Sequence, residues 1–521
     1  MRAEPKTLNP VTAVDAPSRD VLRRLHADLI SIDRRSQQTV PSLASSWTVS
    51  GNRYTLQLRP GLRFSDGAPF GAADVVFSFA VYQDEKLGAP QRDLLTIDGK
   101  PIVVRQTGPL TVEFTLPAPY AAAERLFDSV AMLPRHQLET AWKSGKLRDA
   151  WPLTASPSSV AGLGPFRLKQ YRPGEAVVLE RNPYYWKRSG GETLPYLDGL
   201  EFKVLPDEDL QLARFVAGDL DLLSRPSAKA AEFLRAQPGV EFSDLGSSLE
   251  YNFLCLNLTP GNPKLKWFGQ VAFRQALSRA VDREAMVKLA YRGHATALWG
   301  HVSPGNKLWF RTGMPQPARS IAAAREQLRA AGFTWSNEGS LLDAAGSPVA
   351  FSILVSASSA ERQQMATLLQ DDWKALGIAV TVAPAEFRSV LDRVLKTRQF
   401  DTCLLGLGGM GDADPNPEMG VWRSSGAMHL WNPGQQQPSL PWEAELDRLM
   451  SAQMVTVNHA ARKRLYDQVQ QIVAREQPMI FLVSPNVLVA QRRVGNFRPA
   501  VLDHPALWNV EELYLRPDTK R

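Results

Sequence analysis

The feature that most constrains the fold is the segment 43–79, which reads LASSWTVSGNRYTLQLRPGLRFSDGAPFGAADVVFSF. Two short alternating runs, 47–49 and 54–58, flank a Gly-Asn pair and predict a β-hairpin. Gly67 ends a second tight turn, where a glycine can take a positive φ. Asp74 is placed to accept backbone hydrogen bonds at the start of a helix. The segment contains no nucleophile, metal ligand set or phosphate-binding loop, so it predicts a fold and not a chemistry.

The length and composition are those of a large globular protein. The 521 residues exceed what one hydrophobic core supports, so two or three domains are expected. No run of 18 or more apolar residues occurs, and no transmembrane helix is predicted. The formal charge of +7 comes from scattered lysines and arginines. Because no basic stripe is interleaved with aromatic residues, nucleic-acid binding is not expected.

The region 360–407 alternates the patterns of helices and strands. Four apolar residues share one helical face before Gly377: Met365, Leu368, Leu369 and Leu376. An alternating strand follows at 378–382, then a helical spacing at 390–395 and a buried strand at 400–407. This order predicts a sheet covered by helices.

The two cysteines lie in apolar, strand-like runs. Cys255 is in FLCLNL and Cys403 is in TCLLGL, which favours buried thiols. A disulfide stays open as an alternative if the two strands are neighbours in an oxidising compartment. Neither cysteine has a nearby histidine with which to form a metal or catalytic set.

The segment 43–79 also resembles a family signature. It is similar to the "P-LA-x-SW … Y-x-L-x-LR-x-G-x-x-F-x-DG-x-P-x-x-A-x-DV-x-FS" pattern of the peptide/nickel class (family 5) of extracellular solute-binding proteins, which are capture subunits of ABC importers. Further blocks resemble that family in the same order along the chain: 4–10 (EPKTLNP), 162–166 (GLGPF), 181–186 (RNPYYW), 251–257 (YNFLCLN) and 271–283.

The resemblance implies an α/β fold of the periplasmic-binding-protein-like class II, with two lobes, a hinge and an inserted smaller domain. By analogy, lobe I comprises 1–38, 163–250 and 484–521, the inserted domain comprises 39–162, and lobe III comprises 251–483. The crossings near 250 and 484 are then hinge strands, and the lobes close around a ligand.

The resemblance also implies a location and partners. The protein is expected to be periplasmic or extracytoplasmic, and the N-terminus MRAEPKTLNP lacks the apolar region of a signal peptide. A signal segment absent from this chain reconciles the two observations, and a cytoplasmic protein is the alternative. The expected partners are an ABC permease and its ATPase. Membrane contact is expected only through the permease or a removed lipid anchor, and the protein is expected to be a monomer.

A glycine-rich loop follows the predicted strand 400–407. The run 406–411 satisfies G-x-G-x-x-G, but 412–417 (DADPNP) continues as a loop and not as a helix. A dinucleotide site needs a helix N-terminus at this point, and two aspartates would repel phosphate. We therefore predict no cofactor here.

The same loop is the candidate ligand site. In peptide-binding relatives a "GW-x-x-D" loop pairs its backbone with an extended peptide, and its aspartate meets the α-ammonium of the ligand. The corresponding places hold Gly408, Gly409, Met410, Gly411 and Asp412. A buried carboxylate needs a cation, so the resemblance implies a positive ligand group. Gly409 replaces the tryptophan and the spacing to the next proline is one residue shorter, so Asp414 is an alternative for this role. A loop aspartate that caps a turn is another.

Two other segments contain candidate ligand contacts. Val14, Asp15 and Ala16 lie where relatives use backbone to pair with the other edge of a peptide, although Asp15 can equally point to solvent. Trp422, Arg423 and Trp431 follow the glycine loop and either line the cleft or pack in the core. Arg423 is a candidate for pairing with a ligand carboxylate.

The remaining motifs argue against an enzyme. The chain has no G-x-S-x-G elbow and no Ser/His/Asp grouping, and its seven histidines are dispersed without metal-ligand spacing. A nickel or haem ligand has no local support, so no cofactor and no metal are predicted. The sequence predicts a binding protein for a peptide or peptide-like solute. The alternatives are an oligosaccharide or other small solute, a sensory role and, in a different class, a secreted hydrolase.

Overall fold

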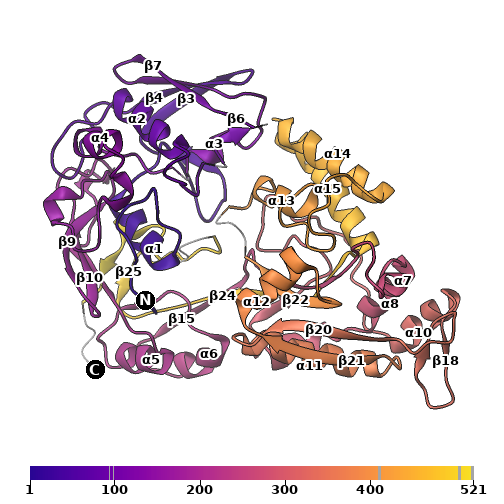
Figure 1. Ribbon diagram of the computed structural model, residues 1–521. Coiled ribbons are helices and arrows are strands. Elements are labelled where there is room, and N and C mark those ends of the chain that lie inside the picture. The colour runs from indigo at the N-terminus through magenta and orange to yellow at the C-terminus, as the bar shows by residue number, and fades with distance from the viewer. Residues whose placement is uncertain (93, 98, 129, 409–411, 503–505, 518–521) are drawn as a thin grey trace.

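The computed structural model describes residues 1–521 except 93, 98, 129, 409–411, 503–505 and 518–521. The described chain forms two halves (Figure 1). One half, indigo to magenta, contains the N-terminal part of the chain, and the other, largely orange, contains the sheet of 251–483. The strands β15 (Glu241–Ser247) and β24 (Val483–Gln491) run side by side where the halves join.

The segment 43–79 folds as the sequence predicts. The strands β3 (Ala44–Ser50) and β4 (Arg53–Leu58) form an antiparallel hairpin in which Trp47 is opposite Leu56. With β8 (Thr111–Thr115) and β7 (Val103–Gly108) they make a sheet in the order β3-β4-β8-β7. The backbone nitrogen of Gly67 donates to the carbonyl of Phe64 at 2.9 Å, and Gly67 has a φ of 91°.

Helix α2 (Ala72–Gln83) begins as expected near Asp74. The Asp74 carboxylate accepts hydrogen bonds from the backbone nitrogens of Gly71 at 3.0 Å and Arg135 at 3.2 Å. Asp74 thus caps its own helix and anchors the start of α4 (Arg135–Lys143).

The N-terminal half has a large, extended core and a small separate cluster around Phe215 and Leu234. A continuous cluster of buried apolar residues runs from Leu8 to Leu179 and includes Val494, Val510 and Leu513 from the C-terminal end. A sheet in the order β13 (Gly199–Lys203), β10 (Ala176–Arg181) and β9 (Phe166–Arg172) contributes to this core through Phe166, Leu168, Val177 and Leu179. The region 39–162 therefore shares its core with the segments around it, and its boundaries as a separate domain stay a prediction.

The sheet that joins the halves is built around β24. This strand pairs with β15, with β14 (Leu222–Leu223) and with β17 (Ala295–Ala297), all antiparallel. The two chain crossings are bonded to each other: Ser248 donates its backbone N–H to the carbonyl of Pro485 at 2.9 Å, and the Ser484 hydroxyl donates to the carbonyl of Ser248 at 3.1 Å.

The second half contains a five-stranded mixed sheet. Its order is β21-β20-β22-β16-β23, with β20 parallel to both neighbours and β16 antiparallel to β22 and β23. The bounds are β16 (Tyr251–Leu256), β20 (Ala350–Ser356), β21 (Ala379–Ala385), β22 (Thr402–Leu407) and β23 (Met479–Phe481). All six residues of β16 are buried. Helix α11 (Ala360–Lys374) packs on β20 and β21, which confirms the sheet covered by helices predicted for 360–407.

The other elements of the N-terminal half are mostly short. They are α1 (Ala16–Leu25), β1 (Ile30–Ile32), β2 (Thr39–Pro41), β5 (Thr96–Ile97), β6 (Lys100–Pro101), α3 (Ala123–Leu126), β9 (Phe166–Arg172), β10 (Ala176–Arg181), β11 (Arg188–Ser189), β12 (Glu192–Thr193), β13 (Gly199–Lys203), α5 (Glu208–Val216) and α6 (Ala228–Arg235). Near the C-terminus, β25 (Val494–Gly495) pairs with β26 (Tyr514–Leu515) in the same half.

Helices and short hairpins surround the five-stranded sheet. They are α7 (Leu265–Phe268), α8 (Val271–Ala280), α9 (Arg283–Leu289), α10 (Ile321–Ala330), β18 (Thr334–Trp335), β19 (Leu341–Leu342), α12 (Phe387–Asp392), α13 (Met419–Trp422), α14 (Pro441–Val455) and α15 (His459–Glu476). Helices α14 and α15 pack against each other. Within the described ranges, no helix combines the length and the apolar character needed to cross a membrane.

The two cysteines are buried free thiols on neighbouring strands. Cys255 of β16 is directly opposite Cys403 of β22. Burial raises the pKa of both thiols, which keeps them protonated. This placement confirms the interpretation of the cysteines as buried.

Candidate functional site

The predicted ligand loop follows β22 at the face of the second half that meets the first. Gly408 is exposed at the end of the strand. Gly409, Met410 and Gly411 lie outside the described residues. The loop from Asp412 leads into a single helical turn at 416–418 and then into α13.

Asp412 is bound by an arginine from the other half. The Nε of Arg125, on α3, lies 2.7 Å from both carboxylate oxygens, and its Nη2 donates to Oδ1 as well. The same guanidinium donates from Nη1 to the backbone carbonyl of Gln37 at 2.9 Å. Burial raises the pKa of the Asp412 carboxyl, and the adjacent Arg125 opposes that rise.

Asp414 has a partner within its own half. Its two carboxylate oxygens accept from Arg462 of α15 at 2.6 and 2.7 Å, and both side chains are almost fully buried. Asp414 also accepts from the backbone nitrogen of Asn416 at 2.9 Å. Arg462 continues to the carbonyl of Gln453 at 3.0 Å. This ion pair fixes the loop to α14 and α15, so the Asp414 side chain is used to hold the loop in place.

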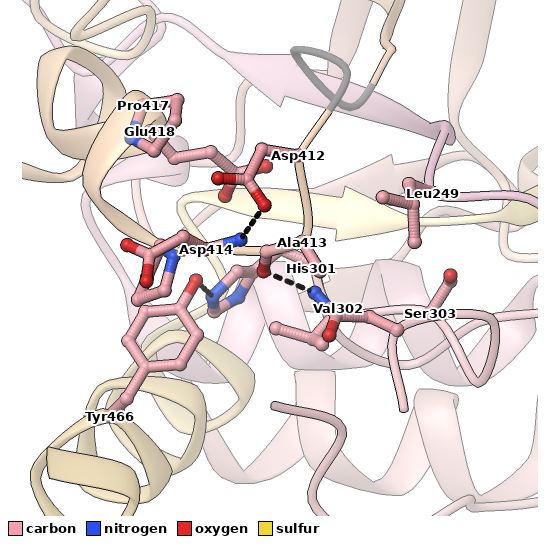
Figure 2. Close-up of a pocket in the computed structure, with 12 residues that line it drawn as sticks. Leu249, His301, Val302, Ser303, Asp412, Ala413, Asp414, Pro417, Glu418 and Tyr466 are labelled. Atoms are coloured by element: carbon pink, nitrogen blue, oxygen red, sulfur yellow. Dashed lines mark hydrogen bonds between the residues drawn. The ribbon is translucent and has the colours of Figure 1, made fainter. Parts of the chain in front are cut away.

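A small cavity lies behind the loop (Figure 2). Its volume is about 20 Å³, which is space for about one water molecule. Asp412, Asp414 and Glu418 line one wall, and His301 and Tyr466 face them. The cavity is too small for a peptide.

Two titratable groups border this cavity, the buried His301 and the partly exposed Glu418. Burial raises the pKa of Glu418 to about 7, although the Trp422 indole donates to its carboxylate at 3.0 Å. Burial lowers the pKa of His301 to about 3, so this imidazole is neutral and shares a hydrogen bond of 3.1 Å with the Tyr466 hydroxyl.

Further hydrogen bonds hold the two halves together beside Asp412. The Gln37 side chain donates to the carbonyl of Gly305 at 2.8 Å and accepts from the backbone nitrogen of Lys307 at 2.9 Å. The backbone nitrogen of Ala121 donates to the carbonyl of Met454 at 2.7 Å. The loop containing Asp412 therefore lies at a contact between the halves.

The N-terminal candidates lie at the start of α1. Asp15 caps this helix, because its carboxylate accepts from the backbone nitrogen of Ser18 at 2.9 Å and from the Ser18 hydroxyl at 2.8 Å. Val14 is 63% exposed, and its carbonyl accepts from Arg19. Ala16 is exposed. The Asp15 side chain is thus used locally, while the surface of Val14 and Ala16 stays accessible.

The two candidate tryptophans pack in the core. Trp422 and Trp431 are 1% and 0% exposed, and their ring centroids are 6.0 Å apart. The Trp431 indole donates to Glu443 at 3.0 Å. Neither lines the cavity behind the loop. Arg423 follows α13 directly, and its Nε is buried without a hydrogen bond to any described residue.

A wider concavity of about 520 Å³ lies elsewhere, at the opposite end of β16 and β22. Asn257, Arg398 and Asp401 are among its lining residues. None of the predicted site residues lines it. In the described part of the chain, no three histidine, cysteine or acidic side chains gather as a metal site would require.

The cationic partners at the site were not predicted from the sequence. Arg125 lies in LPAPYAAAERLFDSV, 287 positions before Asp412, and Arg462 lies 48 positions after Asp414. The available signal was physical: an aspartate of this loop that is buried needs a positive partner, but nothing in the sequence shows which of the 60 basic residues supplies it.

Comparison with known proteins gives relatives of nearly full length, and two of them serve as examples. A "Probable ABC transporter-binding protein" of Deinococcus radiodurans is 29% identical over 509 residues, covering 92% of this chain and 85% of the relative. The oligopeptide-binding protein AppA of Bacillus subtilis is 26% identical, covering 98% of this chain and 90% of the relative.

Solved structures give the same architecture. AppA of Bacillus subtilis, determined with a nonapeptide, has a TM-score of 0.72 at 23% identity and covers 99% of this chain and 97% of its own. NikA of Brucella suis, determined with Fe(III)-EDTA, has a TM-score of 0.83 at 23% identity, with 99% of both chains covered. These structures confirm the predicted two-lobed class II α/β fold.

The family model for bacterial extracellular solute-binding proteins, family 5, matches residues 38–429. That range is most of the chain and contains the hairpin segment, four of the five strands of the mixed sheet (all but β23) and the loop of Asp412. The chain belongs to the bacterial extracellular solute-binding proteins of family 5.

Proposed function

We propose that this protein is the extracytoplasmic capture subunit of an ABC importer and that it takes a peptide or peptide-like solute between its two halves. The observation that carries the proposal is the position of the Asp412 loop, which lies where the halves touch and next to the Arg125 side chain. The two bonded crossings at Ser248 and Ser484 support a hinge, about which the halves can separate and close.

The relatives support the class of ligand. AppA is named for oligopeptides, and other relatives of similar coverage, at 25–26% identity, are named glutathione-binding proteins. Glutathione and oligopeptides share amide bonds and terminal charges. A peptide-like solute is therefore the ligand class that these relatives have in common with the predicted site.

The proposed contacts come from both halves. Val14 and Ala16 offer accessible surface at the start of α1, Gly408 offers exposed backbone at the end of β22, and Asp412 borders the contact. Backbone pairing of this kind binds many side-chain sequences, because the affinity comes from main-chain hydrogen bonds. The partners of the protein are then an ABC permease with its ATPase, and the working form is a monomer that does not chemically change its ligand.

The proposal is tested with the full chain and a defined mixture of tripeptides. Native mass spectrometry of the purified protein, before and after addition of the mixture, shows which members bind. Bound peptides released by acid are expected to have unchanged masses. Release of peptide fragments in proportion to protein concentration would show an enzyme instead. If no tripeptide binds and the protein retains a neutral oligosaccharide, the ligand is a sugar and not a peptide, while the family assignment stands.

A pair of variants locates the site. Asp412→Asn is expected to change the affinity for the retained tripeptides, because it removes the charge at the contact of the halves. Asp371→Asn changes the net charge equally on the exposed side of α11 and is expected to leave the affinity unaltered. Equal affinities for both variants would place the ligand away from the Asp412 loop.

A further inference from the structure

The protein supplies its own cation to Asp412. Arg125 reaches this carboxylate with three hydrogen bonds from the opposite half, and the two side chains are only 10% and 17% exposed. Such a bidentate arginine–carboxylate pair is among the strongest contacts that a carboxylate makes. A ligand ammonium that approaches Asp412 must therefore displace a guanidinium that is already in place.

Both carboxylate oxygens of Asp412 already accept hydrogen bonds from the protein. Oδ1 accepts from Arg125 and from the backbone nitrogen of Asp414, and Oδ2 accepts from the Nε of Arg125. Arg125 is itself held by the backbone carbonyl of Gln37, to which its guanidinium donates. The side chain of Gln37 also links the halves, because it donates to the carbonyl of Gly305. The guanidinium is thus fixed from two sides when the halves are in contact.

The neighbouring carboxylate is neutralised in the same way. Asp414 pairs with Arg462, so each of the two loop aspartates has an arginine of its own. A buried carboxylate selects a cationic ligand only if its charge is otherwise uncompensated. The loop as built does not need a positive ligand group to balance it.

We propose that Arg125 is the specificity-determining residue of this site. By occupying the cation position at Asp412, it makes the closed protein take peptide-like solutes whose end at this point carries no positive charge, such as N-acylated peptides. The assignment rests on the proposed peptide-binding function and names a narrower class of ligand. Removal of Arg125 leaves Asp412 without its partner and turns the site into one that prefers a free ammonium.

The test uses two matched libraries of tripeptides, one with free amino termini and one N-acetylated. Affinities are measured by titration calorimetry for the wild type, for Arg125→Met and for the control Arg319→Met. The control removes an arginine of similar kind, because Arg319 pairs with Asp372 at 2.6 Å within the second half and does not touch Asp412. Thermal unfolding of each variant checks that it is folded.

The wild type is expected to bind acetylated peptides within about threefold of free ones or more tightly, and Arg319→Met is expected to do the same. Arg125→Met is expected to prefer the free amino terminus by at least about tenfold, since the ligand ammonium then replaces the lost charge. If Arg125→Met is unfolded, Arg125→Gln serves in its place. If neither variant folds, the relative affinity of the wild type for acetylated and free peptides decides whether the assignment holds.

Two results overturn the assignment in different ways. A wild type that prefers free amino termini by about tenfold shows that the ligand displaces Arg125; the proposed function then stands and the specificity assignment fails. Absence of binding from both libraries to all the proteins rejects the peptide function and the assignment with it.

Discussion

Glu418 offers the clearest test of how burial shapes the site. This carboxyl lines the small cavity, accepts from the Trp422 indole, and has a pKa raised to about 7 because it is shielded from water. We consider Glu418→Gln, which keeps the shape and an acceptor for the indole while removing the titration.

The sign of the effect follows from proton linkage. The folded protein keeps a proton on Glu418 up to a pH of about 7, whereas the unfolded chain loses it near 4.5. Between these values the folded state binds more protons, so the free energy of unfolding falls as the pH rises. The full difference corresponds to about 3 kcal/mol. Because Glu418 retains some solvent exposure, we expect about 1–3 kcal/mol.

Amide hydrogen exchange measures this effect locally, which avoids treating a protein of several domains as one cooperative unit. Protection of α13, corrected for the chemical exchange rate, is expected to fall in the wild type between about pH 5 and about pH 8. Glu418→Gln is expected to show a flatter dependence and higher protection at the upper pH. Glu445→Gln, an exposed carboxyl of α14, serves as the control with the wild-type dependence. An unchanged slope in Glu418→Gln would refute the reasoning.

Two substitutions test the packing around the site. Asp414→Asn leaves the buried Arg462 without its countercharge and is expected to lower the free energy of local opening of α15, measured by amide hydrogen exchange, by about 3–5 kcal/mol; a loss below about 1 kcal/mol would contradict the buried ion pair. Gly377→Ala is expected to cost about 1–3 kcal/mol in the same assay, because Gly377 has a φ of 86° and a Cβ there would lie 2.2 Å from the carbonyl oxygen of Gly339. Unaltered exchange protection of the backbone around Gly377 in Gly377→Ala would show that this turn can rearrange.

Local elements were predictable because their signals are short-range. The hairpin of 44–58 follows from strand alternation around a Gly-Asn pair, and α11 follows from apolar spacing that ends at Gly377. The overall fold followed from an ordered resemblance along most of the chain, which the family match confirms. The shared core from Leu8 to Leu179 was not visible in the sequence, because apolar periodicity does not show which elements a helix packs against.

The site was predictable only in part. The loop of Asp412 was predicted from its resemblance to the loop that follows the corresponding strand in peptide-binding relatives, and the structure puts it at the contact of the halves. Its partner Arg125 is 287 positions away, and an ion pair between residues so far apart produces no periodic pattern in the sequence. For Trp431 the sequence left two interpretations open, a side chain that lines the cleft or one that packs in the core. The structure shows a fully buried side chain whose indole donates to Glu443, so Trp431 packs in the core. The ligand roles of the site residues stay predictions.

The position of β24 has a consequence for how the chain is made. This strand begins at Val483, yet it is the partner of β14, β15 and β17, which precede it by about 190 to 260 positions. The strands of 44–115 can pair early in synthesis, because no partner lies further away than Thr115 does from Arg53, a separation of 62 positions. The strands that await β24 keep unpaired edges until nearly the whole chain is available. A nascent chain thus stays open at the junction between its halves, where a chaperone that recognises exposed strand edges can act longest.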